Sequence, residues 1–339
     1  DSWGNLLDLV AMFDSGPQTS HTSIYAVRKN LNALRGVTAA ESPTASPLAE
    51  PEPGASMFEG GPGFANGQFK EPRGLCLDSK NRVYVTDTRN YRLQVFDPEG
   101  KYIGQIGQQG ADIGQFEEPM DAATDRNDQV YVLDTWNHRI QVFDANGVHQ
   151  NVIQGEFYGP RGIAIDRQTD IIYVTDTGHH VVKVFSPKGD LIRKIGNPAD
   201  QAGNADGEFN EPIGMDVNSD GEVFVVDTRN ARVQVFNRIW QHKASWPVQL
   251  TTEPNRGVES HIVCASDGTV FLTDPIGGRV LSFDREGNPL GEWREDADGE
   301  PLRTPLGIAV RESKAAPTPG KILLVTDLYD HKVRRIRVP

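Results

Sequence analysis

The chain has 339 residues, of which 37% are hydrophobic, and its 47 acidic side chains outnumber 34 lysines and arginines, giving a formal net charge of −13. This acidic balance is atypical of proteins that bind phosphate backbones, so no general nucleic-acid binding is expected. The two cysteines, Cys76 and Cys264, exclude a disulfide framework and a cysteine-based metal cluster. No apolar run approaches the roughly 18 residues of a transmembrane helix, so no membrane span is predicted.

The N-terminal 54 residues divide into two segments of different composition. Residues 1–36 contain Leu6, Leu9, Val10 and Phe13 at helical spacing, which predicts a short, partly helical segment that acts as a tether or docking element. Residues 37–54 consist mainly of Ala, Pro, Ser and Glu, a composition typical of an extended linker. Because the chain begins with Asp-Ser-Trp and not with Met, we expect it to be a processed or excised piece.

One pattern then recurs in the third segment, residues 55–339. Its first copy, Gly67 to Phe96, reads GQFKEPRGLCLDSKNRVYVTDTRNYRLQVF, and its second, Gly114 to Phe143, reads GQFEEPMDAATDRNDQVYVLDTWNHRIQVF. The interval between copies, about 40 to 50 residues, is typical of a propeller built from blades of short strands. One aspartate marks each of the six copies, at Asp87, Asp134, Asp176, Asp227, Asp274 and Asp327.

Short apolar runs between turn sequences predict four strands in each copy. In the first copy they are Gly74–Asp78, Arg82–Thr86, Arg92–Phe96 and Tyr102–Ile106. The sixth copy supplies only three, Ile308–Val310, Lys321–Thr326 and Val333–Val338. Residues 55–60 resemble the missing fourth strand, and closing the ring with them would remove exposed sheet edges. The sequence therefore predicts an all-β, six-bladed β-propeller of four-stranded blades, closed by an N-terminal strand and preceded by a partly helical segment.

The motif GQF-x-x-P-x-G, followed by V-Y-V-x-D-T-x-N-x-R and then Q-V-F-D, closely resembles the NHL repeat. The resemblance covers roughly residues 55–339, and it is strong in copies one to four. Copy five lacks the GQF-x-x-P start, and copy six carries the insertion SKAAPTPGK. The resemblance implies a six-bladed propeller and, for most of the family, a binding module. Members contact proteins or RNA, or lie outside the membrane on receptors or sensor kinases, whereas related propellers include an amidating lyase and metal-dependent lactonases.

The recurring aspartates could suggest a ring of catalytic carboxylates, but a structural role is the stronger interpretation. Each is expected to cap the turn that follows it and to pair with a basic residue five positions later. These basic residues are Arg92, Arg139, Arg232, Arg279 and Lys332.

The histidines do not predict a metal site. His138, His180 and His331 share one repeat position at the start of the third strand, where copies in different blades are too far apart to share an ion. His261 differs, because it replaces the glycine that opens the first strand of four other copies, and this places it near the channel mouth. A lone histidine there is a candidate contact residue. No nucleophile elbow or phosphate-binding loop is present, so we assign no catalytic residue, metal or cofactor.

Binding residues are expected on one face of the propeller, formed by the loops that lead into first strands and the turns between second and third strands. The strands begin there with Arg73, Met120, Asp121, Arg161, Ile213, His261 and Leu306 around the channel. Arg and aromatic residues are enriched at interaction hot spots, although Arg89 and Arg229 also fit a role as solvated turn residues. The predicted partner-binding residues are Arg73, Arg89, Trp136, Tyr158, Arg161, His179, Arg229, His261 and Tyr329.

Three functions fit this pattern. The first is a noncatalytic module that holds a protein partner on this face, as a subunit or outer domain of a larger bacterial assembly that is associated with a membrane. The second is a metal-dependent lyase or lactonase-like hydrolase that works in the channel mouth. The third is RNA recognition, with Trp136 and Tyr158 as stacking platforms beside Arg73, Arg89, Arg161 and Arg229. An extracytoplasmic location, periplasmic or at the cell surface, is expected.

Overall fold

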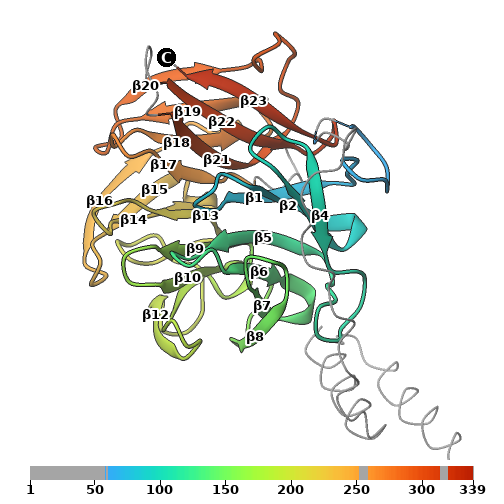
Figure 1. The fold of residues 1–339 in the computed structure, drawn as a ribbon. Coiled ribbons are helices and arrows are strands. Elements are labelled where there is room, and N and C mark those ends of the chain that lie inside the picture. Colours follow the sequence, from blue (N-terminus) through green and yellow to red (C-terminus); the bar gives the residue numbers. More distant parts are fainter. Residues whose placement is uncertain (1–57, 59, 252–258, 314–319, 339) are drawn as a thin grey trace, which may run out of the picture. The chain divides into compact units, whose positions relative to one another are not determined.

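The computed structural model describes residues 58, 60–251, 259–313 and 320–338. The expected partly helical segment 1–36 and linker 37–54 lie outside the described residues, as does most of the expected strand 55–60. The described part of the chain is almost entirely β-structure, arranged as six antiparallel sheets around a common axis (Figure 1). No helix in these described ranges is long and apolar enough to cross a membrane.

The blades follow one another along the chain, each sheet keeping its strands in sequence order. Blade one contains β1 (Pro72–Leu77), β2 (Val83–Asp87), β3 (Arg92–Phe96) and β4 (Tyr102–Ile106). Blade two contains β5 (Pro119–Thr124), β6 (Val130–Asp134), β7 (Arg139–Phe143) and β8 (His149–Gln154). Blade three contains β9 (Gly162–Asp166), β10 (Ile171–Asp176), β11 (Val181–Phe185) and β12 (Leu191–Gly196).

The second half of the ring repeats this arrangement. Blade four contains β13 (Pro212–Val217), β14 (Val223–Asp227), β15 (Arg232–Phe236) and β16 (His242–Pro247). Blade five contains β17 (Ile262–Cys264), β18 (Val270–Asp274), β19 (Arg279–Phe283) and β20 (Pro289–Trp293). Blade six contains β21 (Pro305–Ser313), β22 (Gly320–Asp327) and β23 (Lys332–Val338). Short 3₁₀ helices join the second and third strands of blades one to four, η1 (Thr88–Asn90), η2 (Thr135–Asn137), η3 (Thr177–His179) and η4 (Thr228–Asn230).

The first strand of every blade lies innermost and contacts the first strands of its neighbours, with β21 against β1 (Figure 1). The innermost strand begins earlier than the sequence predicts, because Pro72 already pairs with Asp87. The register shifts between Pro72 and Leu75, and the Gly74 N–H donates to the Thr86 hydroxyl at 2.8 Å. This irregularity resembles a β-bulge and turns the first residues of the strand toward the channel.

The core lies between the blades and not inside any one of them. Tyr84 and Val95 of blade one pack on Phe116 and Val132 of blade two, and all four are almost fully buried. Middle strands such as β2 and β3 are buried at every position. A strand covered on both faces needs apolar residues at successive positions, which explains why the repeat reads V-Y-V and Q-V-F without strict alternation.

Phe58 supports the predicted closure of the ring. Its carbonyl accepts the Val333 N–H of β23 at 3.3 Å, and its side chain is 1% exposed. Val333 is the blade-six counterpart of Val233, whose partner is Trp246 in the fourth strand of blade four. Phe58 therefore occupies the position of a fourth strand on the outer edge of β23.

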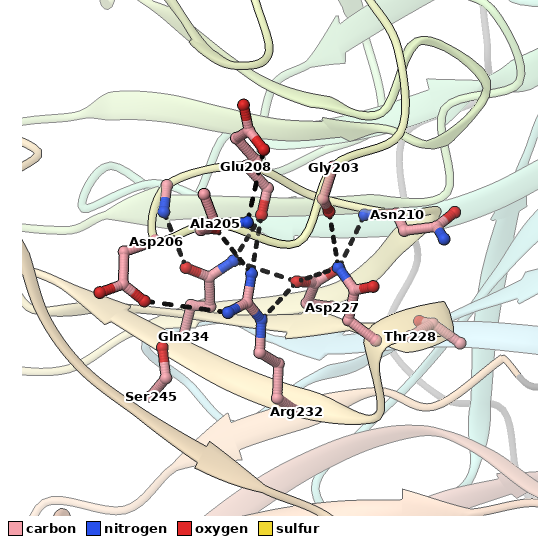
Figure 2. A network of polar contacts seen from close by, with 12 residues as sticks. Gly203, Ala205, Asp206, Glu208, Asn210, Asp227, Thr228, Arg232, Gln234 and Ser245 are labelled. Carbon is pink, nitrogen blue, oxygen red and sulfur yellow. Dashed lines mark hydrogen bonds and ion pairs between the residues drawn. The ribbon is translucent and has the colours of Figure 1, made fainter.

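A polar network repeats inside the blades, and Figure 2 shows it in blade four. The Asp227 carboxylate is fully buried and accepts the Asn210 N–H at 2.8 Å, Arg232 Nε at 2.7 Å and Gln234 Nε2 at 3.1 Å. Arg232 also donates to the Ala205 carbonyl at 2.8 Å. Every member thus has a partner within one blade, so the predicted aspartate–arginine pair is one part of a larger structural unit.

Two details of the predicted network differ from the structure. In blades one to four the aspartate side chains form no cap on the 3₁₀ helices that follow, because their oxygens accept N–H groups of the preceding loop. In blades five and six the predicted cap is present, since Asp274 accepts the Gly277 N–H at 3.2 Å and Asp327 accepts the Asp330 N–H at 3.4 Å. In blade six Arg334, not Lys332, lies 4.0 Å from Asp327. In blade three, where position 181 is valine, Lys183 lies 2.6 Å from Asp176.

The three histidines of the repeat position connect neighbouring blades. His138 Nδ1 lies 2.8 Å from the Phe157 carbonyl, whereas His180 and His331 accept the N–H groups of Glu211 and Glu71, each at 3.0 Å. All three have a left-handed backbone conformation. Each imidazole is therefore engaged in a separate contact between blades.

Candidate binding face and channel mouth

The loops that lead into the first strands and the turns between second and third strands lie at one end of the ring. We call this end the loop face. Its residues discussed below are Phe64, Glu71, Arg73, Arg89, Glu118, Trp136, Tyr158, Arg161, Glu211, Arg229, Glu259 and Tyr329.

Charged residues from three alternate blades meet at the channel mouth. Arg73 of blade one and Arg161 of blade three each bond one oxygen of the same carboxylate, that of Glu259, which leads into blade five. Their side chains are 15%, 30% and 21% exposed, respectively. Burial, with the charge of Arg161 as the second cause, lowers the pKa of Arg73 to about 10, and burial also lowers the pKa of Arg161. We call these three residues the mouth cluster.

The arginines farther out on the loop face are paired with glutamates. Arg89 Nε lies 3.3 Å from Glu71, and its Nη1 bonds Glu118. Arg229 Nε lies 2.9 Å from Glu211. The expected gathering of arginines is present, but acidic partners balance it, so this face is not the basic patch that the arginines alone indicate.

The predicted aromatic residues differ in their exposure. Tyr158 and Tyr329 are 45% and 60% exposed, whereas Trp136 is half-buried and donates from Nε1 to Glu118 at 3.0 Å. Phe64, which the sequence analysis did not select, is 71% exposed, and the Lys70 Nζ lies 5.6 Å from its ring centroid. Three exposed aromatic rings therefore lie on the loop face.

His179 has a structural contact in addition to its place on the face. Its Nδ1 lies 2.7 Å from Asp176, in the position where Asn90 contacts Asp87 in blade one. Its ring also lies 5.6 Å from that of Tyr158. The His179 ring thus packs against that of Tyr158, and its side chain is 33% exposed.

Beneath the mouth cluster the channel encloses a cavity of about 510 Å³, lined by the first strands of all six blades. His261 lines it, as expected, and is 8% exposed, with Nδ1 4.0 Å from the Asp121 carboxylate. That distance is too long for a hydrogen bond. Burial, followed by the charges of Arg73 and Arg161, lowers the pKa of His261 to about 4, so the imidazole is neutral at pH 7.

Two carboxylates line the same cavity. Burial raises the pKa of Asp121 to about 7 and that of Asp216 to about 6. Their oxygens accept main-chain N–H groups of the next blade, from Ile163 at 3.1 Å and from Cys264 at 2.7 Å. These contacts join blade two to three and blade four to five, which gives both aspartates a structural role in the ring.

The glutamates of the loop face had a signal in the sequence that we did not use. Glu71, Glu118 and Glu211 each precede the proline that opens the first strand, so an acidic residue recurs at this place in the motif. Glu259 carried no comparable signal, because the fifth copy lacks the motif. Its importance follows only from the ring geometry.

Family comparisons agree with the repeat pattern. A family described as a 6-bladed beta-propeller matches residues 69–154, and the NHL repeat matches residues 157–185 and 209–236. Among curated proteins, Protein brain tumor of Drosophila melanogaster is 44% identical over 48 residues, covering 14% of this chain and 5% of that protein. The B-box type zinc finger protein ncl-1 of Caenorhabditis elegans is 45% identical over 40 residues, covering 12% and 5%. The chain thus spans a small fraction of these relatives.

Solved structures share the fold at low sequence identity. A Bacteroides thetaiotaomicron protein of unknown function superimposes with a TM-score of 0.58 at 13% identity, covering 87% of this chain and 76% of that one. A catalytically inactive virginiamycin B lyase from Staphylococcus aureus with quinupristin gives 0.54 at 13% identity, covering 79% and 80%. Identities this low show the fold alone. The family matches and the ring therefore show a six-bladed β-propeller that carries NHL repeats in blades three and four.

Proposed function

We propose that this propeller is a noncatalytic interaction module that holds a protein partner on its loop face. The observation that carries this proposal is the presence of Phe64, Tyr158 and Tyr329 on that face, with 71%, 45% and 60% of each residue exposed. Aromatic rings and arginines are the residue types that contribute most to protein interfaces. Burying these rings against a partner would remove apolar surface from water.

The charges of the loop face favour a protein partner over RNA. Two exposed arginines have a glutamate within ion-pair distance, Arg89 with Glu71 and Arg229 with Glu211. Such glutamates repel phosphates, and a nucleic-acid site gains its affinity from unopposed cations. Alternating charges instead suit the polar rim of a protein interface, where they set orientation and reject wrong partners.

We also propose where the protein works and what kind of assembly it belongs to. It acts as a subunit or outer domain of a larger bacterial assembly associated with a membrane, and it works outside the cytoplasm. Residues 1–36, with apolar residues at helical spacing, and the Pro-rich residues 37–54 support a tethered arrangement. Fractionation of the source cells, followed by detection of the chain in each fraction, tests this location.

A second candidate function is a lyase or hydrolase reaction in the channel mouth. His261 favours it, because a neutral imidazole lines the cavity below two arginines, and a neutral imidazole can accept a proton from a substrate. Turnover of a substrate by the wild-type protein, abolished in His261→Gln, would support this function and contradict the noncatalytic one.

Affinity capture from the source organism tests the interaction module. We compare the wild-type protein with Tyr158→Ala/Tyr329→Ala and with a matched control, Ile239→Ala/Leu290→Ala, whose residues are 66% and 59% exposed on the outside of blades four and five. The partner should be captured by the wild type and the control, and about tenfold less by the loop-face variant. Equal capture by all three proteins would contradict the proposal.

A further inference from the structure

The mouth cluster places two guanidinium groups on one carboxylate. Arg73 and Arg161 reach Glu259 from opposite sides, one on each oxygen. Both guanidinium groups thus share one carboxylate, and Glu71 lies farther from Arg73, at 3.8 Å from its Nη2. Arg73 Nε is also buried without a hydrogen-bond partner. The cluster therefore combines a shared, partly exposed carboxylate with an unused donor at the channel mouth.

The other ion pairs of the repeat differ from this cluster. Asp87 and Asp134 are fully buried, and each accepts from one arginine of its own blade. The mouth cluster joins side chains of three blades. The Glu259 side chain is 21% exposed, so another molecule can replace its carboxylate from the solvent side without opening any sheet.

We propose that Arg73 and Arg161 form the binding site for a carboxylate of the partner, and that Glu259 occupies this site in the free protein and is displaced on binding. This inference rests on the proposed function, because it names the chemical group that the loop face receives. The incoming group is either an Asp or Glu side chain or the C-terminus of a chain. Both present the planar pair of oxygens that Glu259 presents.

The surrounding charges favour a carboxylate over a phosphate. Glu71 lies 3.8 Å from Arg73 Nη2, and Glu118 acts on the charges of both arginines. A phosphate carries up to two negative charges, so it meets more repulsion from this acidic rim than a carboxylate does. A carboxylate exchanging with Glu259 keeps the number of charges in the site unchanged. Arginine is well suited to such an exchange, because its planar guanidinium group can contact the incoming carboxylate with the geometry that it has with Glu259.

Two fluorescent hexapeptides serve as probes, measured by fluorescence anisotropy. The first contains glutamates and an amidated C-terminus, and the second contains alanines and a free C-terminal carboxylate. Glu259→Gln should bind one of them about tenfold more tightly than wild type, because the internal competitor is removed. The peptide that gains identifies the source of the carboxylate. Adding Arg161→Gln to Glu259→Gln should abolish the gain.

Asp206→Asn is the matched control, since it removes the same charge from a loop that leads into a first strand. The Asp206 side chain is 66% exposed and lies 3.8 Å from Arg232, so its loss should change peptide affinity less than about twofold. Equal gains in Glu259→Gln and Asp206→Asn would overturn the inference, because net charge would then explain both. No gain in a folded Glu259→Gln protein would overturn it too. If Glu259→Gln does not fold, Glu259→Asp replaces it, and it should give a smaller gain that Arg161→Gln again removes.

The outcomes separate this inference from the proposed function. Loss of partner capture in Tyr158→Ala/Tyr329→Ala, with no peptide gain in Glu259→Gln, would retain the interaction module and reject the carboxylate site. A peptide gain that needs Arg161, with capture unaffected by the tyrosine variant, would retain the site and reject the module as proposed.

Discussion

The polar networks of the blades and the mouth cluster use the same two groups, a carboxylate and a guanidinium, in opposite ways. In blade four Asp227 is fully buried, and every donor around it belongs to the same repeat. At the mouth Glu259 is 21% exposed and its partners come from two other blades. The network is repeated and buried, whereas the cluster joins three blades and is partly exposed to solvent.

This difference separates charges that stabilise the fold from charges available for binding. A buried network with all partners present is costly to disturb, because each donor left without its acceptor remains away from water. A partly exposed cluster that water can reach can exchange one anion for another at lower cost. The same ion pair therefore has a different role according to its burial and to the number of blades that supply it.

The largest predicted effect is on the buried network. Asp227→Ala should lower the free energy of unfolding by about 3–5 kcal/mol, because it removes the buried charge that balances the partly buried Arg232 guanidinium and leaves the Asn210 N–H without its acceptor. Chemical denaturation followed by circular dichroism measures this change. The control Asp206→Ala removes a carboxylate that is 66% exposed and 3.8 Å from Arg232, and it should cost less than about 1 kcal/mol. Similar losses of stability in both variants would contradict the distinction between buried and solvent-exposed ion pairs.

A buried carboxylate without a guanidinium gives the second prediction. Burial raises the pKa of Asp121 from 3.8 to about 7, so between these values the folded state holds a proton that the unfolded state has released. Stability should therefore decrease as the pH rises from about 4 to 7, by on the order of 3 kcal/mol from this group. The lowered pKa of His261 has the opposite effect on stability below the ordinary histidine value of 6.5. The wild-type protein and the Asp121→Asn variant tested below both keep His261.

Urea denaturation at pH 5 and pH 7.5 tests this dependence. Asp121→Asn should lose part of the decrease in stability between the two pH values, whereas Asp206→Asn should keep the wild-type decrease. An Asp121→Asn protein whose stability falls as steeply as that of wild type would contradict the prediction. Such a result would mean that Asp121 is ionised in the fold.

The sequence predicted the fold well because the fold is local and repeated. Each blade is encoded by one copy of the motif, and the orphan strand before the first copy pointed to Phe58, which bonds Val333 of β23. The early start of β1 at Pro72 was missed because the shift in register depends on the Thr86 hydroxyl. Such a contact cannot be inferred from alternation of apolar residues.

The candidate site was only partly predictable for a related reason. Arg73 and Arg161 were selected from their repeat position, and His261 from the glycine that it replaces. Glu259 was not selected, because its contacts cross between blades one, three and five and no local motif encodes them. Similarly, the pairing of Arg89 with Glu118 joins two copies of the repeat. The ring geometry brings these residues together, so the charge balance of the face becomes visible only in the folded chain.

The smallest predicted effect concerns the stability of the mouth cluster itself. Glu259→Gln should change the free energy of unfolding by about 1 kcal/mol or less, because the side chains of Glu259 and Arg161 remain 21% and 30% exposed and water can reach the freed guanidinium. Arg73 is the more buried partner, and Glu71 at 3.8 Å offsets part of its charge. Thermal and urea denaturation of Glu259→Gln and Asp227→Ala, carried out side by side, measures how much each variant loses relative to wild type. If Glu259→Gln destabilises the protein as much as Asp227→Ala does, the mouth cluster is a structural element that joins three blades, and its carboxylate is not free to exchange with a partner.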